Sequence, residues 1–270
     1  MLIYIKRRCP VRVLFVGDVV SDSGCKCLMQ LLPNFKKINA IDFCVVNGEN
    51  SAVGNGITPL SCNDILTAGA DLVTGGNHTL SRQEFHEFLD NNSFAAIRPA
   101  NLHRTAPGKG TAVLTRGSKK LGIINLMGAA FMDYTAVNPF DCLDEKIKEM
   151  EDDGIKCILV DFHAEATGEK RALGFFADGR VSAVIGTHTH VRTADAQILP
   201  NGTAYLTDAG MKGPVQSVLG VEPQAIIKKM HTGLPVRFTN PGGACSMGCV
   251  VIEIDEKTGK AISIESYEIS

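Results

Sequence analysis

Short apolar runs rich in β-branched residues recur along this chain, and they constrain its fold more than any other feature. Most span about four to eight residues between Gly, Asn or Asp, which is typical of buried strands. They lie at 11–17, 42–47, 71–75, 111–116, 121–126, 156–162, 181–186, 203–207 and 248–254.

Segments with helical periodicity lie between many of these runs. Residues 82–90 carry apolar side chains on one face behind Ser81 and Glu84, whose spacing is that of a capping box. Residues 139–151 have a similar periodicity and begin with a proline suited to a first helical turn. Strands that alternate with helices indicate an α/β fold.

The 111–126 stretch departs from this alternation, because its two strands are joined directly at "RGSKK" and predict a hairpin. No repeat, low-complexity tract or linker divides the 270 residues. We therefore predict one domain over residues 1–270, with residues 1–10 as an N-terminal extension outside the core.

The overall charge argues against some classes of partner. The formal net charge is −2, so neither a basic nucleic-acid-binding surface nor a polybasic membrane patch is indicated. No run approaches the ~18 uncharged apolar residues that indicate a membrane-spanning helix. We expect a cytoplasmic protein, and the sequence leaves a homo-oligomer open.

The nine cysteines are an odd set, and several lie within apolar runs such as "FCVVNG". This usage is typical of reduced, buried thiols in a cytosolic protein rather than of a disulfide framework. Two close pairs, Cys25 with Cys27 and Cys245 with Cys249, would allow metal or redox chemistry. Neither pair has zinc-ribbon spacing, and we favour a structural role for both.

Residue types that bind metals follow five of the predicted strands. Because ligand sites in open α/β sheets lie beyond the carboxyl ends of the strands, we expect these side chains to meet. They are Asp18 after 11–17, Glu49 and Asn50 after 42–47, Asn77 and His78 after 71–75, His163 at the end of 156–162, and His188 and His190 after 181–186.

This mixture of donors indicates a particular kind of metal site. Carboxylate, amide and imidazole groups together favour Mn, Fe or Zn over Ca²⁺ or Mg²⁺, which prefer oxygen alone. The set exceeds what one four-coordinate ion needs, so two ions bridged by Glu49 are the simplest hypothesis. Such a pair would activate a hydroxide for phosphate-ester hydrolysis. His78 would be free to protonate the leaving alkoxide or to stabilise charge on the phosphoryl oxygens.

Each of these residues also has an ordinary structural explanation. Asp18 alone is more often a cap or turn residue, and "GEN" and "GNH" often supply only turn geometry. His163 alone is more often a hydrogen-bonded buried histidine. His188 and His190 are a more specific signal, since residues i and i+2 of an extended chain share a face. The coincidence at five strand ends favours the metal site. No role is assigned to the remaining histidines, His86, His103 and His231.

Taken in order, the motifs "GDVV", "NGENSAVGNG", "GGNHT", "DFHAEAT" and "GTHTHVRTAD", followed by "GTAYLTDAG", resemble those of the calcineurin-like metallophosphoesterases. More narrowly, the chain resembles the bacterial YmdB-like group, which is similar to 2′,3′-cyclic-nucleotide phosphodiesterases. The resemblance runs from about Val11 to about Glu268. It implies a four-layer α/β/β/α sandwich with a dinuclear metal centre at its edge, which the alternation of elements alone does not distinguish from a doubly wound sheet.

The resemblance also implies how the ligands divide. One metal would take Asp18, Glu49, Asn50 and His190, and the other Glu49, Asn77, His163 and His188, with His78 as the proton donor. Departures from the wider superfamily are Val20, where many members have a histidine ligand, and Glu49, where many have a bridging Asp. Departures from the narrower group are Cys25, Leu80 and Ala129, where Arg, Trp and Arg are expected. These spare the inferred ligands and bear on substrate preference.

We therefore predict a dinuclear-metal phosphodiesterase that opens 2′,3′-cyclic nucleotides by attack of a metal-bridging hydroxide on phosphorus. The cyclic substrate follows from the family likeness, since the ligands indicate only hydrolysis. The expected metals are iron or manganese, with zinc as an alternative, and the expected partner is a small phosphodiester or cyclic nucleotide. Two alternatives stay open: a phosphomonoesterase or nucleotidase on the same metals, and a regulatory metal-binding protein that acts through a partner or RNA.

Overall fold

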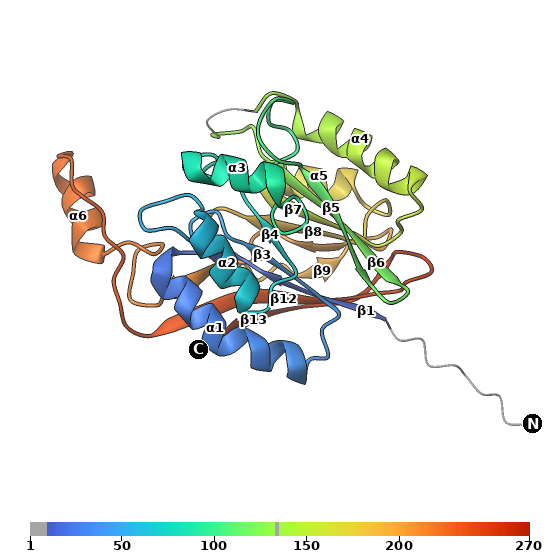
Figure 1. Ribbon diagram of the computed structural model, residues 1–270, viewed down its shortest axis with the longest axis horizontal. Helices are drawn as coiled ribbons and strands as arrows, with labels where there is room; N and C mark the ends of the chain where they lie inside the picture. Colours follow the sequence, from blue (N-terminus) through green and yellow to red (C-terminus); the bar gives the residue numbers. More distant parts are fainter. Residues whose placement is uncertain (1–9, 133–134) are drawn as a thin grey trace, which may run out of the picture.

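The computed structural model describes residues 10–132 and 135–270, which form two β-sheets flanked by helices (Figure 1). The helices are α1 (Ser21–Ile38), α2 (Pro59–Thr67), α3 (Gln83–Asn91), α4 (Pro139–Asp152), α5 (Thr167–Phe176) and α6 (Pro223–Thr232). Residues 1–9 of the predicted N-terminal extension lie outside the described residues. The single domain stays a prediction.

The first sheet has the strand order β2-β11-β12-β1-β3-β4, and β13 also pairs with β12. Its strands are β1 (Val11–Val16), β2 (Asp18–Val19), β3 (Phe43–Asn47), β4 (Leu72–Thr74), β11 (Met211–Pro214), β12 (Cys245–Ile254) and β13 (Ala261–Ile269). Strands β1, β3 and β4 are parallel, so their carboxyl ends share one edge.

The second sheet has the strand order β5-β6-β7-β8-β10-β9. Its strands are β5 (Thr111–Arg116), β6 (Lys119–Met127), β7 (Ile158–His163), β8 (Ala183–Thr187), β9 (Gln197–Ile198) and β10 (Ala204–Leu206). Strands β5 and β6 form the predicted antiparallel hairpin, with Arg116 opposite Lys119. Strands β6, β7, β8 and β10 are parallel.

The central core lies between the two sheets. Val13 and Phe15 of the first sheet cluster there with Ile123 and Ile185 of the second, and all four side chains are fully buried. Each such side chain stabilises the fold by about 1.5–3 kcal/mol relative to leaving it exposed. Further clusters join the first sheet to α1, α2 and α3, and the second sheet to α4 and α5. The layers are therefore helix, sheet, sheet, helix, which confirms the predicted four-layer sandwich.

Two details of the elements differ from the sequence-based expectation. The predicted capping box at Ser81 and Glu84 is wrong, because α3 begins after Arg82 and has no side-chain cap. Ser81 instead closes a turn, its N–H donating to the carbonyl of His78. The capping box that does form is at α2, where the Thr58 side chain accepts from the N–H of Ser61 and the Ser61 hydroxyl accepts from the N–H of Thr58.

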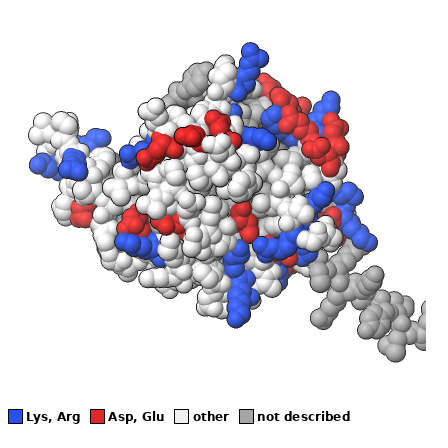
Figure 2. Space-filling model, in the orientation of Figure 1, with Lys and Arg blue, Asp and Glu red and all other residues white. Residues whose placement is uncertain are grey.

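Charged side chains of both signs are interspersed over the face shown in Figure 2, where acidic residues gather over α4. This face shows no continuous basic surface, in keeping with the net charge. Helix α6 stands away from the layers, and none of its residues is buried (Figure 1). Within residues 10–132 and 135–270, every helix is too short or too polar to cross a bilayer.

Candidate metal centre

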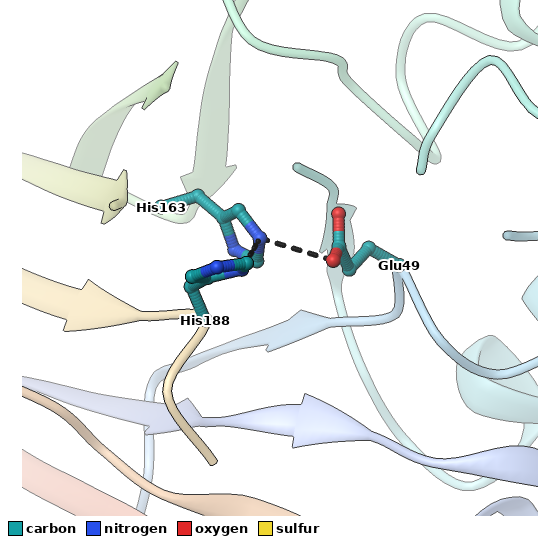
Figure 3. Close-up of side chains that lie close together, drawn as sticks. All are labelled: Glu49, His163 and His188. Atoms are coloured by element: carbon teal, nitrogen blue, oxygen red, sulfur yellow. Dashed lines mark hydrogen bonds and ion pairs between the residues drawn. The ribbon is translucent and has the colours of Figure 1, made fainter. Parts of the chain in front are cut away.

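Side chains at the ends of five strands converge where the two sheets meet. Strands β1, β3 and β4 belong to the first sheet, and β7 and β8 to the second. Glu49 follows β3, His163 ends β7 and His188 follows β8, and Figure 3 shows these three side chains pointing toward one another. One ligand atom from each lies within 4.8 Å of the others. The predicted convergence of strands from separate parts of the chain is therefore present.

One half of the site surrounds the ring of His163, which is fully buried. Its Nε2 lies 3.0 Å from Glu49 Oε1, 3.0 Å from Asn77 Oδ1 and 3.0 Å from His188 Nδ1. The four residues are those that the family resemblance groups around a single ion. Their donor atoms face one small volume.

The other half surrounds Asp18, the first residue of β2. Its Oδ1 lies 3.7 Å from His190 Nε2 and 3.9 Å from His163 Nδ1, and its Oδ2 accepts the backbone N–H of His188 at 3.1 Å. Asn50 Nδ2 donates to Glu49 Oε1 at 3.2 Å and lies 3.3 Å from His190 Nε2. A half-turn of the Asn50 amide would place its oxygen in the same position.

These donor atoms suit metal ions. A proton on His163 Nε2 can serve only one of the three neighbours that face it at 3.0 Å. Asp18 Oδ1 is buried and has no hydrogen-bond partner in the part of the chain that the structure describes. Buried polar atoms of this kind normally have a hydrogen-bond partner. A carboxylate oxygen without one, beside two imidazoles, is a combination of donors that suits a transition metal. The residues present therefore fit a metal centre.

Gly76 leaves room for this centre. A Cβ at Gly76 would lie 2.2 Å from Glu49 Oε2 and 2.3 Å from the ring of His163. Because real Cβ atoms do not approach other heavy atoms this closely, a larger residue would push both side chains out of place. The glycine of "GGNH" thus has a steric function beside the site, and backbone freedom is not needed to explain it.

Each histidine of the cluster is held by its outer ring nitrogen. The Thr187 hydroxyl donates to Asp161 Oδ1 at 2.7 Å, so Thr187 Oγ1 is left to accept the Nδ1–H of His163 at 3.0 Å. His188 Nε2 lies 3.1 Å from Glu165 Oε2. With a metal ion in place of the inner proton, the neutral ring of each would direct its other nitrogen, with a lone pair, toward the site.

His190 follows the same rule, since its Nδ1 lies 3.1 Å from the carbonyl of Leu219 and its Nε2 faces Asp18. Asp161 is itself fully buried and accepts from the side chains of Asn47 and Thr74. The imidazoles are therefore oriented by a second set of hydrogen bonds before any ion binds.

Burial and charge shift the pKa values within the cluster. Burial alone would lower the pKa of His163, but the Glu49 carboxylate outweighs it and raises that pKa. Burial opposes ionisation of Glu49, yet the charge and hydrogen bond of His163 lower its pKa. Burial, and then the charge of His163, lower the pKa of His188 to about 4. Burial raises the pKa of Asp18 despite two histidine neighbours. A bound cation would compensate this buried charge and displace the proton of His163.

The backbone that carries the two paired histidines is not extended, so the predicted reason for their spacing is wrong. His188 has φ of 99° and His190 has φ of 63°, both in the left-handed region. Side chains rarely adopt this region, at a cost on the order of 1–3 kcal/mol each. The two histidines therefore reach the site because the chain turns after β8.

A buried ion pair holds this turn in place. Asp208 Oδ2 accepts from the N–H and hydroxyl of Thr189, at 3.0 and 2.7 Å, and from Lys170 Nζ at 2.8 Å. Lys170 also donates to the carbonyl of Thr187 at 2.8 Å. Lys170 and Asp208 are almost fully buried. Neither residue is among those predicted from the sequence. The local signal for Lys170 was a charged residue at a position of α5 that faces the sheet.

His78 lies at the edge of the cluster and is partly buried. Its backbone N–H donates to Glu49 Oε2 at 3.1 Å, and its ring Nε2 lies 3.4 Å from Asn77 Nδ2. Of the three departures from the narrower family, Ala129 is exposed and its N–H donates to Glu169, whereas Cys25 is buried in the core beside the first sheet. Leu80 packs against that same core.

The chain is similar to a known protein family and to proteins of solved structure over nearly its whole length. Residues 14–267 match the profile of the YmdB-like protein family. A 2′,3′-cyclic-nucleotide 2′-phosphodiesterase from Bacillus subtilis strain 168 is 45% identical over 260 residues, which cover 96% of this chain and 97% of that protein. The crystal structure of a novel phosphatase from Mycoplasma pneumoniae has a TM-score of 0.90 at 32% identity, covering 97% of this chain and 94% of that one. The crystal structure of a hypothetical protein from Thermus thermophilus has a TM-score of 0.88 at 38% identity, covering 95% of this chain and 98% of that one.

Proposed function

The chain belongs to the YmdB-like protein family and is a phosphoric ester hydrolase, and we propose that its substrates are 2′,3′-cyclic nucleotides. The name of the Bacillus subtilis relative supports the choice of substrate. The observation that carries the metal-dependent mechanism is the convergence of Glu49, Asn77 and His188 on His163 Nε2, each at 3.0 Å.

Our proposal for the ligands follows the two halves of the cluster. One ion would be held by Asp18, Glu49, Asn50 and His190, and the other by Glu49, Asn77, His163 and His188. Glu49 is the proposed bridge because its carboxylate contacts both halves of the cluster, at 3.0 Å from His163 Nε2 and 3.2 Å from Asn50 Nδ2. The mixed oxygen and nitrogen donors support iron or manganese, with zinc as the alternative.

When bound, the two ions supply Lewis acidity and a water of lowered pKa at neutral pH. The protein's own contribution is to orient the donors and to move one proton. We assign that proton transfer to His78, whose ring lies beside Asn77 and would protonate the oxygen that leaves phosphorus. A cytoplasmic location is part of the proposal and is supported by the free, mostly buried thiols.

The test measures bound iron, manganese and zinc together with turnover of 2′,3′-cyclic AMP, a generic phosphodiester and a phosphomonoester. Asn77→Ala should lose both metal and activity. His78→Ala should keep its metal and lose about 10²–10⁴-fold in kcat, the usual contribution of a positioned acid.

His103→Ala is the matched control, because His103 is exposed and its ring contacts only Thr105 among the residues described. It should behave as wild type. Faster turnover of the monoester than of either diester would replace the proposal with the phosphatase alternative. Metal-loaded protein without activity on any phosphodiester would refute the catalytic proposal itself.

A further inference from the structure

Two short cysteine spacings in the sequence are explained by one cluster in the structure. Cys25 and Cys249 are buried in the core between the first sheet and its helices. Cys27 of α1 instead accepts a hydrogen bond from Lys212 of β11, and Cys245 of β12 approaches the same part of α1 through the carbonyl of Ser23. We refer to Cys27, Lys212 and Cys245 as the thiol–lysine cluster.

Lys212 is unusual because its side chain is fully buried without an acidic partner. Its Nζ donates to Cys27 Sγ and, at 3.0 Å, to the carbonyl of Ser246. No carboxylate of the described residues forms an ion pair with it, whereas the other fully buried lysine, Lys170, is paired with Asp208 at 2.8 Å. Burying an unpaired ammonium is costly, and the sulfur of Cys27 is the side-chain acceptor that the structure places beside it.

Cys245 gives this buried pair a second thiol near solvent. It is half-buried, and its Sγ lies 3.9 Å from the carbonyl of Ser23, one turn before Cys27 on α1, and 3.7 Å from the carbonyl of Gly243, which precedes β12. The core thiols lack these features. Burial raises the pKa of Cys62 to about 12, and no lysine contacts it among the described residues.

We propose that Cys27 and Cys245 form a peroxide-reactive dithiol site in which Lys212 activates Cys27. The inference is independent of the proposed phosphodiesterase activity, since none of the three residues belongs to the metal centre. It rests on the hydrogen bond from Lys212 to Cys27 and on the approach of Cys245 to the turn of α1 that leads to Cys27.

The chemistry balances with hydrogen peroxide as the oxidant. Cys27 Sγ attacks one peroxide oxygen as its thiol proton passes to Lys212, the S–O bond forms as the O–O bond breaks, and Lys212 returns a proton to the departing hydroxide, which leaves as water. Cys245 Sγ then attacks the sulfenic acid sulfur of Cys27, the S–S bond forms as the S–O bond breaks, and the hydroxide takes the Cys245 thiol proton. The two thiols lose two electrons, and peroxide becomes two waters.

The experiment uses the full chain with Cys9→Ser, because Cys9 lies outside the described residues and would add a background thiol. The protein is exposed to equimolar hydrogen peroxide, the remaining thiols are alkylated, and peptide masses identify the disulfides. We expect an intramolecular disulfide between Cys27 and Cys245 that dithiothreitol reverses. Cys62 and Cys142 should stay reduced and are the internal controls.

Two variants test the role of each partner. Lys212→Met should slow disulfide formation by about tenfold or more, because Cys27 loses its hydrogen-bond donor and the group that exchanges protons with it. Cys245→Ser should stop the reaction at the sulfenic acid, which dimedone traps on Cys27. The second variant keeps the test decisive if Lys212→Met does not fold. Oxidation of Cys62 as fast as Cys27, a wild-type rate in folded Lys212→Met, or no dimedone adduct on Cys27 would each overturn the proposal.

Discussion

Removing the charge of Lys170 is the sharpest test of how the histidine turn is held. Lys170→Met keeps an unbranched side chain at a position that is 1% exposed, and it leaves the fully buried Asp208 without its cation. Breaking a buried ion pair from one side typically costs about 3–5 kcal/mol. Asp208 keeps three other hydrogen bonds, from Thr189 N, Thr189 Oγ1 and Gly210 N. These stabilise its charge, so we expect a loss of about 3 kcal/mol, at the low end of that range.

The assay is denaturant unfolding of the metal-free protein, followed by titration with manganese. A loss of about 3 kcal/mol corresponds to a melting temperature lower by roughly 6–12 °C for a chain of this size. Affinity for the ion should also fall, by about 10–100-fold, because the turn that carries His188 and His190 loses its anchor. Adding Asp208→Asn to the variant should restore part of the stability, since the unpaired charge is removed.

Lys26→Met is the matched control, because Lys26 forms an exposed ion pair with Asp22 on α1. It should unfold and bind metal as wild type does. The reasoning fails if Lys170→Met unfolds within about 1 kcal/mol of wild type and keeps its manganese affinity, because the pair would then neither stabilise the fold nor position the turn.

Three further predictions concern the cluster itself. Gly76→Ala should abolish metal binding while leaving a folded protein, which metal analysis and circular dichroism would check, because its Cβ would lie 2.2 Å from Glu49 Oε2. Thr187→Val should lower metal affinity about 10–100-fold, as measured by competition with a chelator, because His163 loses the acceptor of its Nδ1 proton; an unchanged affinity would contradict this role. In the metal-free protein the pKa of His163 is raised to about 9 by Glu49 against the effect of burial, so the stabilisation it brings is complete below about 6.5 and lost as pH rises through 9. Denaturation curves from pH 6 to 10 should show that loss, and a flat profile would speak against the pair.

The layered fold and the position of the site follow from local patterns in the sequence. Apolar runs of strand length end at residues such as Asp18 and His163, and parallel strands bring those ends together whatever the sequence distance between them. The turn after β8 could not be predicted in this way. Its left-handed residues depend on Asp208 and Lys170, which lie 38 positions apart and meet only through tertiary packing.

Other elements escaped prediction for different physical reasons. Strand β13 exposes residues on both faces along much of its length, so its sequence lacks the buried apolar run that marked the predicted strands. The thiol–lysine cluster was hidden because each close cysteine pair divides between the core and the cluster. The spacing of the cysteines along the chain does not show which of them lie in the core and which lie in the cluster.

The metal centre draws its residues from both sheets, and the contact from the His188 N–H to Asp18 joins positions 170 residues apart. An ion bound there would hold the two sheets of the sandwich together. At a free ion concentration 100 times the dissociation constant, such linkage adds about 2.7 kcal/mol to stability. Scarcity of the ion would then shorten the lifetime of the enzyme in the cell, because the opened chain is exposed to proteases. Metal supply would govern how much protein there is as well as how fast it works.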